Sequence, residues 1–263
     1  MNSYLDKIID QTISSVEIDK QKIPLQELKS YLSDLNSTKG FFEAIKTRND
    51  KGLISVIAEI KKASPSQGLI RENFNPKDIA QSYQESQATC LSILTDAPYF
   101  QGSLEDLASV REVVELPLLR KDFIVDDYQI YQSRFYGADC ILLIASVLSD
   151  TQLKEFKEIA QELNLDVLIE VHDASEMDRA KKLDFPLIGI NNRDLKTFNV
   201  NIETTIKLSE NFQNKIIVSE SGIKTKEDVK KILSSGTKTF LVGESFMRAA
   251  DPGEELKNLF FSS

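Results

Sequence analysis

The feature that most constrains the fold is a cycle that begins near residue 54 and occurs eight times along the chain. In each cycle a short run of apolar and β-branched residues is followed by a turn and then by a segment with helical periodicity. Most runs are continuously apolar rather than alternating, which is typical of strands covered on both faces. The runs are 54–60, 89–95, 117–123, 140–146, 166–171, 186–191, 215–220 and 238–244.

The intervening segments carry the start and stop signals of amphipathic helices. Ser149 is followed three residues later by Gln152, the pattern of a capping box, and apolar residues then recur at helical spacing up to residue 163. The segment 125–137 starts with acidic residues and ends at Gly137, and 225–236 runs from Thr225 to Gly236. We therefore predict strands that alternate with helices.

Eight such units in 263 residues predict an α/β fold, a closed (β/α)8 TIM barrel, for which ~250 residues is typical. A doubly wound open sheet is the rival fold, but it usually has fewer strands and a glycine-rich first turn that this sequence lacks. We expect a barrel catalytic domain over residues 51–263 and an N-terminal helical extension, residues 1–50, packed on the barrel. The connection after the first run spans ~15 residues, a length that favours an active-site lid.

Net charge limits the class of partner, and cysteine usage indicates the cellular compartment. The net charge of -9 disfavours nucleic acid and anionic membranes as partners. Cys90 and Cys140 lie in apolar runs without a CxxC pattern, so we expect reduced core residues in a cytoplasmic protein. Charged residues interrupt the N-terminal segment, so we expect that it is not a signal peptide. No apolar run approaches the ~20 residues of a membrane span. We expect a monomer that acts on a small molecule.

Polar and charged residues collect at the ends of the apolar runs. In a parallel barrel the carboxyl ends of the strands meet at one face, so these residues converge in space. Each could form only a structural ion pair, the usual fate of such charges, but their joint placement favours a pocket. They are Glu59, Lys61, Lys121, Glu170, Asn191, Arg193, Glu220, Ser221 and Gly243.

Phosphate is the ligand best supported by these residues. Ser221 and Gly222 come shortly before a predicted helix, where N–H groups attract anions, and Gly243 follows the eighth run. Barrels often bind phosphate after strands seven and eight, although glycines also serve simply to permit tight turns. The single histidine, His172, cannot form a metal site alone, so we expect it to be structural or solvent-facing and expect no metal.

Six motifs are distributed along the chain: VIAEIKKASPSQG, ILTDAPYFQGS, PLLRKDFIVDDYQI, IEVHD, IGINNRDL and SESGI. Together these motifs resemble the indole-3-glycerol-phosphate synthase family over nearly the whole chain. The resemblance implies a cofactor-free lyase of tryptophan biosynthesis. It implies that 1-(2-carboxyphenylamino)-1-deoxyribulose 5-phosphate closes to an indole ring with loss of carbon dioxide and water.

The resemblance also implies residue roles. Lys121 is the general acid that protonates the ribulose carbonyl, Glu170 performs acid–base work in the dehydration, and Glu59 holds the substrate and the lysine. Lys61 lies near the substrate carboxylate with a proton-transfer role left open, and Asn191 supports the glutamates. The implied substrate-binding residues are Ser64, Phe123, Arg193, Glu220 and Ser221, and the phosphate-binding residues are Lys61, Ser221, Gly222, Gly243 and Ser245.

Several points stay open at this stage. Tyr99, Phe100 and Phe123 either form a wall for the anthranilate ring or pack in the core. Arg120 and Asp122, on the other side of the strand from Lys121, are expected to pair with their surroundings. The alternatives to a synthase are a Schiff-base aldolase that uses Lys121 as nucleophile and a non-catalytic phosphosugar-binding barrel.

Overall fold

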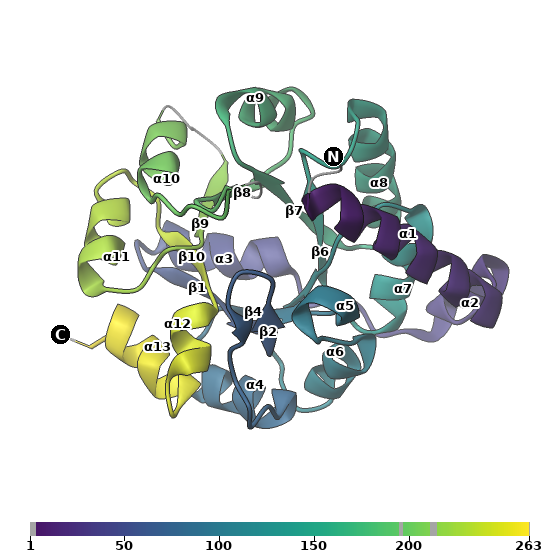
Figure 1. The fold of residues 1–263 in the computed structure, drawn as a ribbon, viewed down its shortest axis with the longest axis horizontal. Helices are drawn as coiled ribbons and strands as arrows, with labels where there is room; N and C mark the ends of the chain where they lie inside the picture. Colours follow the sequence, from purple (N-terminus) through teal and green to yellow (C-terminus); the bar gives the residue numbers. More distant parts are fainter. Residues whose placement is uncertain (1–3, 195–196, 211–214, 263) are drawn as a thin grey trace.

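Eight parallel strands close into a barrel in the computed structural model of the protein, which describes residues 4–194, 197–210 and 215–262 (Figure 1). Around the barrel the strand order is β1-β10-β9-β8-β7-β6-β5-β4, and β4 pairs with β1 to close it. Each predicted run contains one strand, so the (β/α)8 fold is confirmed. The strands are β1 Ser55–Ile60, β4 Cys90–Leu94, β5 Leu118–Lys121, β6 Cys140–Ile144, β7 Asp166–Val171, β8 Leu187–Asn191, β9 Ile216–Glu220 and β10 Thr239–Val242.

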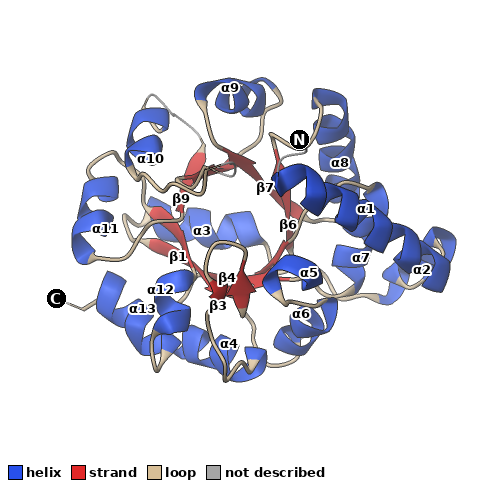
Figure 2. Ribbon diagram, in the orientation of Figure 1, coloured by secondary structure: helices blue, strands red, loops and turns tan. Residues whose placement is uncertain are grey.

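Helices surround the barrel, as the ring of blue ribbons in Figure 2 shows. The predicted capping boxes are present at Ser149 and Thr225, and Gly137 adopts a positive φ of 86° just after its helix. The helices after the strands are α4 Pro76–Glu85, α5 Ala97–Phe100, α6 Leu104–Arg111, α7 Asp127–Phe135, α8 Asp150–Glu162, α9 Ala174–Lys182, α10 Glu203–Leu208, α11 Lys226–Leu233, α12 Glu244–Arg248 and α13 Pro252–Phe260.

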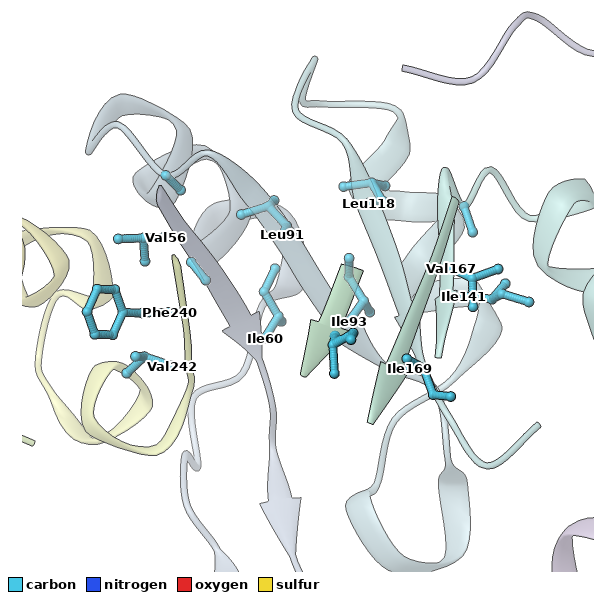
Figure 3. Close-up of a cluster of buried hydrophobic side chains, with 14 of the residues drawn as sticks. Val56, Ile60, Leu91, Ile93, Leu118, Ile141, Val167, Ile169, Phe240 and Val242 are labelled. Carbon is cyan, nitrogen blue, oxygen red and sulfur yellow. The ribbon is translucent and has the colours of Figure 1, made fainter. Parts of the chain in front are cut away.

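The core has two layers because side chains alternate along each strand. Val56 and Ile60 point outward from β1 into the layer between strands and helices, where they join residues such as Phe240 (Figure 3). Ile57 and Cys90 belong to the second layer, inside the barrel. Cys90 and Cys140 are buried and unbonded to each other, as expected for core cysteines.

The N-terminal segment reaches both ends of the barrel. It contains α1 Tyr4–Lys22, α2 Leu25–Ser30, a short 3-10 helix Leu32–Asp34 and α3 Phe41–Asp50. The sequence pattern indicates no separate helix at α3. Phe41 and Ile45 of α3 are fully buried against Ile57 and Leu119, so α3 closes the end of the barrel that Figure 1 places behind the strands.

The long connection after β1 folds over the opposite end, here called the mouth. It contains a small antiparallel hairpin, β2 Ala63–Ser64 with β3 Gly68–Leu69, which lies in front of the barrel in Figure 1. Of the predicted segments, Met1–Ser3, Leu195 of the INNRDL motif and Ser263 lie outside the described residues. Within the described ranges, no helix is long and apolar enough to cross a membrane.

Candidate active site

The residues singled out in the sequence come together in one pocket at the mouth. Strands from all around the barrel contribute to it, because the carboxyl ends of parallel strands meet there. The predicted residues that line the pocket are Glu59, Lys61, Ser64, Lys121, Phe123, Glu170, Asn191, Arg193, Glu220, Ser221, Gly222, Gly243 and Ser245.

Lys121 lies at the centre of the charged residues. Its Nζ is 2.9 Å from Oε2 of Glu170 on β7 and 3.5 Å from Oε2 of Glu220 on β9. Both carboxyl groups are almost completely buried, at 2% residue exposure each. A buried charge requires a partner, so the ammonium and the two carboxyl groups depend on one another.

The carboxylates decide the proton affinity of this lysine. Burial alone would lower the pKa of Lys121, but Glu170, Glu220 and Glu59 raise it well above its ordinary value. Burial alone would likewise raise the pKa of Glu170, but Lys121 and His172 lower it below its ordinary value. In the free protein Lys121 is therefore an ammonium and Glu170 a carboxylate.

Glu220 differs from Glu170. Its Oε1 is buried and has no hydrogen-bond partner among the described residues, and burial raises the pKa of this carboxyl group to about 8. Gly189 on β8 provides the space for it, because a Cβ there would lie 2.0 Å from Oε1 of Glu220. Burial thus favours the protonated form of Glu220, whereas Lys121 favours its carboxylate.

Glu59 of β1 pairs with Lys61, the first residue after the strand. Lys61 Nζ donates a hydrogen bond to Oε1 of Glu59, and both side chains face the pocket. Gly243, after β10, makes this position possible, because a Cβ there would lie 2.5 Å from Oε1 of Glu59. Gly243 therefore has a packing role in addition to the phosphate contact expected from sequence.

Two turns border the pocket near Arg193. Ser221 and Gly222 both have positive φ values, 68° and 79°, and a Cβ on Gly222 would meet Val200 at 2.4 Å. A left-handed conformation at a non-glycine residue such as Ser221 is strained and is often found at functional sites. Ser245 Oγ donates to the carbonyl of Ile223 at 2.8 Å.

Glu244 also lines the pocket, where a carboxylate would repel an anionic ligand. Its place between Gly243 and Ser245, two residues expected to bind phosphate, would favour a side chain that points away, but Glu244 faces the pocket. Its two oxygens instead lie 3.5 Å from Nη2 of Arg193 and 3.2 Å from Nε of Arg248, which neutralise its charge.

The aromatic residues divide between the pocket and the N-terminal helix. Phe100 and Phe123 line the pocket, with ring centroids 6.4 Å apart. Tyr99 is absent from the lining; it packs against Tyr4 of α1 at 5.7 Å and donates a hydrogen bond to the carbonyl of Lys7. Sequence reasoning missed Tyr4, Leu5 and Ile8, which also line the pocket, because α1 precedes the repeating pattern. It also missed Phe198, which lies in the connection between β8 and α10.

Arg120 and Asp122 behave as expected. Nη2 of Arg120 lies 2.9 Å from Oδ2 of Asp122, and both residues are buried, although Asp122 also lines the pocket. Thr95 donates a hydrogen bond to the same carboxylate at 2.6 Å. The pair therefore anchors β5 and leaves Lys121 to face the pocket.

His172 takes the structural setting rather than the solvent-facing one, the two settings that the sequence left open. Its Nε2 lies 3.3 Å from Oε1 of Glu170, a contact that sequence reasoning missed. The pattern offered a signal, since residues two apart at the end of a strand point to the same side. Within the described residues, no group of three or more His, Cys, Asp or Glu side chains is placed to hold a metal ion.

Comparison with known proteins points to one family. A profile described as indole-3-glycerol phosphate synthase matches residues 5–259. The indole-3-glycerol phosphate synthase of Delftia acidovorans is 48% identical over 266 residues, covering 99% of this chain and 100% of that protein. That of Neisseria gonorrhoeae is 45% identical over 260 residues, again covering 99% and 100%.

Solved structures with low sequence identity share the fold. Thiamine phosphate pyrophosphorylase from Pyrococcus furiosus is 18% identical with a TM-score of 0.59, covering 78% of this chain and 93% of that chain. The 3-hexulose-6-phosphate synthase from Salmonella typhimurium is 12% identical with a TM-score of 0.63, covering 78% and 96%. At these identities the likeness concerns the barrel alone.

Proposed function

The chain belongs to the indole-3-glycerol phosphate synthase family, decarboxylating lyases of tryptophan biosynthesis, and from that premise we propose which of its residues carry the reaction. The substrate is a small molecule, which we take to be 1-(2-carboxyphenylamino)-1-deoxyribulose 5-phosphate. The observation that carries the assignment of roles is Lys121, an ammonium held between two buried carboxyl groups in the pocket.

Lys121 is the general acid of ring closure. The aromatic carbon that bears the carboxylate attacks the ribulose carbonyl carbon, and the electron pair of the C=O bond moves onto oxygen, which takes a proton from Lys121. An alkoxide is far more basic than an amine, so this transfer is favourable even from a lysine whose pKa is raised. The buried ammonium also stabilises the negative charge as it develops.

Glu170 performs the acid–base work of the dehydration. Carbon dioxide leaves first, and its bonding electrons neutralise the iminium formed by ring closure. Glu170 then accepts the proton lost from the carbon next to nitrogen and returns it to the departing hydroxyl group. Since Glu170 contacts Nζ of Lys121 at 2.9 Å, loss of the lysine's proton raises the proton affinity of the glutamate when it is needed.

The remaining residues bind and orient the substrate. Lys61, held by Glu59, supplies a positive charge for the substrate carboxylate or phosphate. The phosphate lies against the turns at Ser221–Gly222 and Gly243–Ser245, beside Arg193. Phe123 borders the aromatic ring, Ser64 of the β2–β3 hairpin covers the substrate, and Asn191 orients it.

The two alternatives left open by the sequence fit this pocket less well. A Schiff-base lysine must be a neutral amine to attack a carbonyl. The carboxylates around Lys121 keep it protonated. A binding protein, in turn, has no need to bury a lysine between two carboxyl groups, since this costs desolvation without improving affinity for an anion.

We also propose that the catalytic domain spans residues 51–263, that residues 1–50 extend it, and that the protein is a cytoplasmic monomer. Sedimentation at several protein concentrations should give a constant mass near 29.7 kDa. A mass that rises with concentration would contradict the monomer.

The activity is tested by following indole fluorescence after mixing substrate with chelator-treated protein. Lys121→Ala should reduce turnover ~10²-fold or more, the usual scale for a positioned acid. Lys154→Ala, which removes an exposed lysine of α8, is the matched control and should keep full turnover. Phosphate-ligand binding without indole formation, or full turnover by Lys121→Ala, would refute the assignment. Borohydride trapping of substrate on Lys121 would favour the aldolase.

A further inference from the structure

His172 joins the active-site carboxylate to a second, more distant carboxylate. On one side its Nε2 lies 3.3 Å from Oε1 of Glu170. On the other side its Nδ1 lies 3.1 Å from Oε2 of Glu176, on the first turn of α9. The histidine therefore connects β7, which carries Glu170, to the helix that follows it.

The contact with Glu176 fixes the ring. The same Oε2 of Glu176 accepts a hydrogen bond from the backbone N–H of His172 at 2.8 Å. The side chains of His172 and Glu176 are both only 14% exposed, so water competes weakly for these contacts. The Glu170 contact differs, because Nε2 has no aligned hydrogen-bond partner among the described residues. It is mainly a charge interaction.

Glu170 is thus held from both sides. Its Oε2 contacts Lys121 of β5 and its Oε1 faces His172, while Glu220 of β9 approaches the same lysine. When Lys121 gives its proton to the substrate, Glu170 keeps one cationic neighbour only if His172 is charged. Without it, a carboxylate at 2% exposure would be left unpaired during the reaction, which is costly.

We propose that His172, held by Glu176, is a positioning residue that keeps the Glu170 carboxylate in place while Lys121 is deprotonated. This inference rests on the proposed role of Glu170. Burial alone would lower the pKa of His172, but Glu170 and Glu176 raise it to about 10, so the imidazolium persists at neutral pH.

The test compares the wild type with His172→Gln and Glu176→Gln. His172→Gln keeps a side-chain donor but removes the charge. Glu176→Gln keeps an acceptor for the backbone N–H but removes the negative charge that supports the imidazolium. The matched control is Asp178→Asn, which removes a 78% exposed carboxylate from the same helix.

Misplacing Glu170 should lower kcat roughly 10- to 100-fold in His172→Gln, with a smaller change in KM. The acid limb of kcat/KM should move to higher pH, because Glu170 loses a cation. Glu176→Gln should show the same changes to a smaller degree, and Asp178→Asn should show none.

NMR titration of the imidazole provides a readout independent of activity, since the chain has one histidine. The pKa of the wild-type imidazole should lie well above its ordinary value of about 6.5. In Glu176→Gln this pKa should be lower than in the wild type. Titration near 6.5 in the wild type would overturn the inference. The inference would also be overturned if His172→Gln had the kcat and pH profile of the wild type and differed from it only in thermal stability. An inactive wild type would instead refute the proposed function.

Discussion

At the residue scale, the site depends on small residues placed opposite carboxyl groups. Gly189 faces Glu220 and Gly243 faces Glu59, each so closely that a Cβ would overlap a carboxylate oxygen. Glycine in a strand often marks a position where another group approaches closely. Here the approaching group is a buried acid that lines the pocket, which explains glycines that contribute nothing to the apolar core.

The unusual proton affinity of Glu220 predicts a pH-dependent stability. Its pKa is raised from an unfolded value near 4.3 to about 8. The folded state therefore binds the proton more tightly than the unfolded state does. This binding stabilises the fold fully below pH ~4.3, and the stabilisation is lost as the pH rises through about 8. The side chain introduced by Glu220→Gln cannot ionise. The melting temperature of this variant minus that of the wild type should therefore increase as the pH rises from 5 to 9.

The same series of melting temperatures should be measured for Glu158→Gln, an exposed glutamate of α8 at 58% exposure, as control. A constant difference between Glu220→Gln and the wild type across this pH range would show that Glu220 is ionised in the folded protein.

At the element scale, the connection between β1 and α4 is attached to the other end of the chain. Nη1 of Arg71 donates to the carbonyls of Met247 and Ala249, and Nη2 donates to that of Ala250. Gln67 accepts a hydrogen bond from Arg248 at 2.8 Å. The hairpin that covers the pocket is therefore held by the segment after β10.

Arg71→Lys should loosen this connection, because an ammonium cannot reproduce the planar arrangement of donors of a guanidinium. Loss of one or two charge-assisted hydrogen bonds at a partly exposed site should raise KM roughly 3- to 10-fold, with a smaller effect on kcat. Limited proteolysis should cleave the connection faster in the variant. Unchanged KM and cleavage rate would mean that the connection is held by other contacts.

At the scale of the whole molecule, the N-terminal segment contributes to both ends of the barrel. Helix α3 closes the end opposite the pocket, whereas Tyr4, Leu5 and Ile8 of α1 line the pocket itself. One continuous segment thus contributes to the barrel core at one end and to the pocket lining at the other.

This separation predicts that stability and activity respond independently to a change at α3. Phe41 has no exposed surface, so Phe41→Ala should reduce the free energy of unfolding by about 3–5 kcal/mol in urea titrations. KM, measured at a temperature where the variant is folded, should stay within twofold of the wild type. A large rise in KM would show that the two ends of the barrel are coupled.

Local patterns in the sequence were sufficient for the barrel and for most of its site. Continuous apolar runs determine the strands, caps such as Ser149 and Thr225 determine helix starts, and the fold itself gathers Lys121, Glu170 and Glu220 at one face. These features depend on neighbours within a few residues and on one topological rule, so they can be predicted without coordinates.

The tertiary structure decided what depends on contacts between distant residues. Tyr4 of the pocket lining packs against Tyr99 and Phe198, which lie far from it in the sequence, and no local period encodes these contacts. The charge state of Lys121 follows from carboxylates on β1, β7 and β9, and that of His172 from β7 and α9. Sequence determines which groups reach the mouth; their separations and burial, which set each pKa, arise only when the barrel closes.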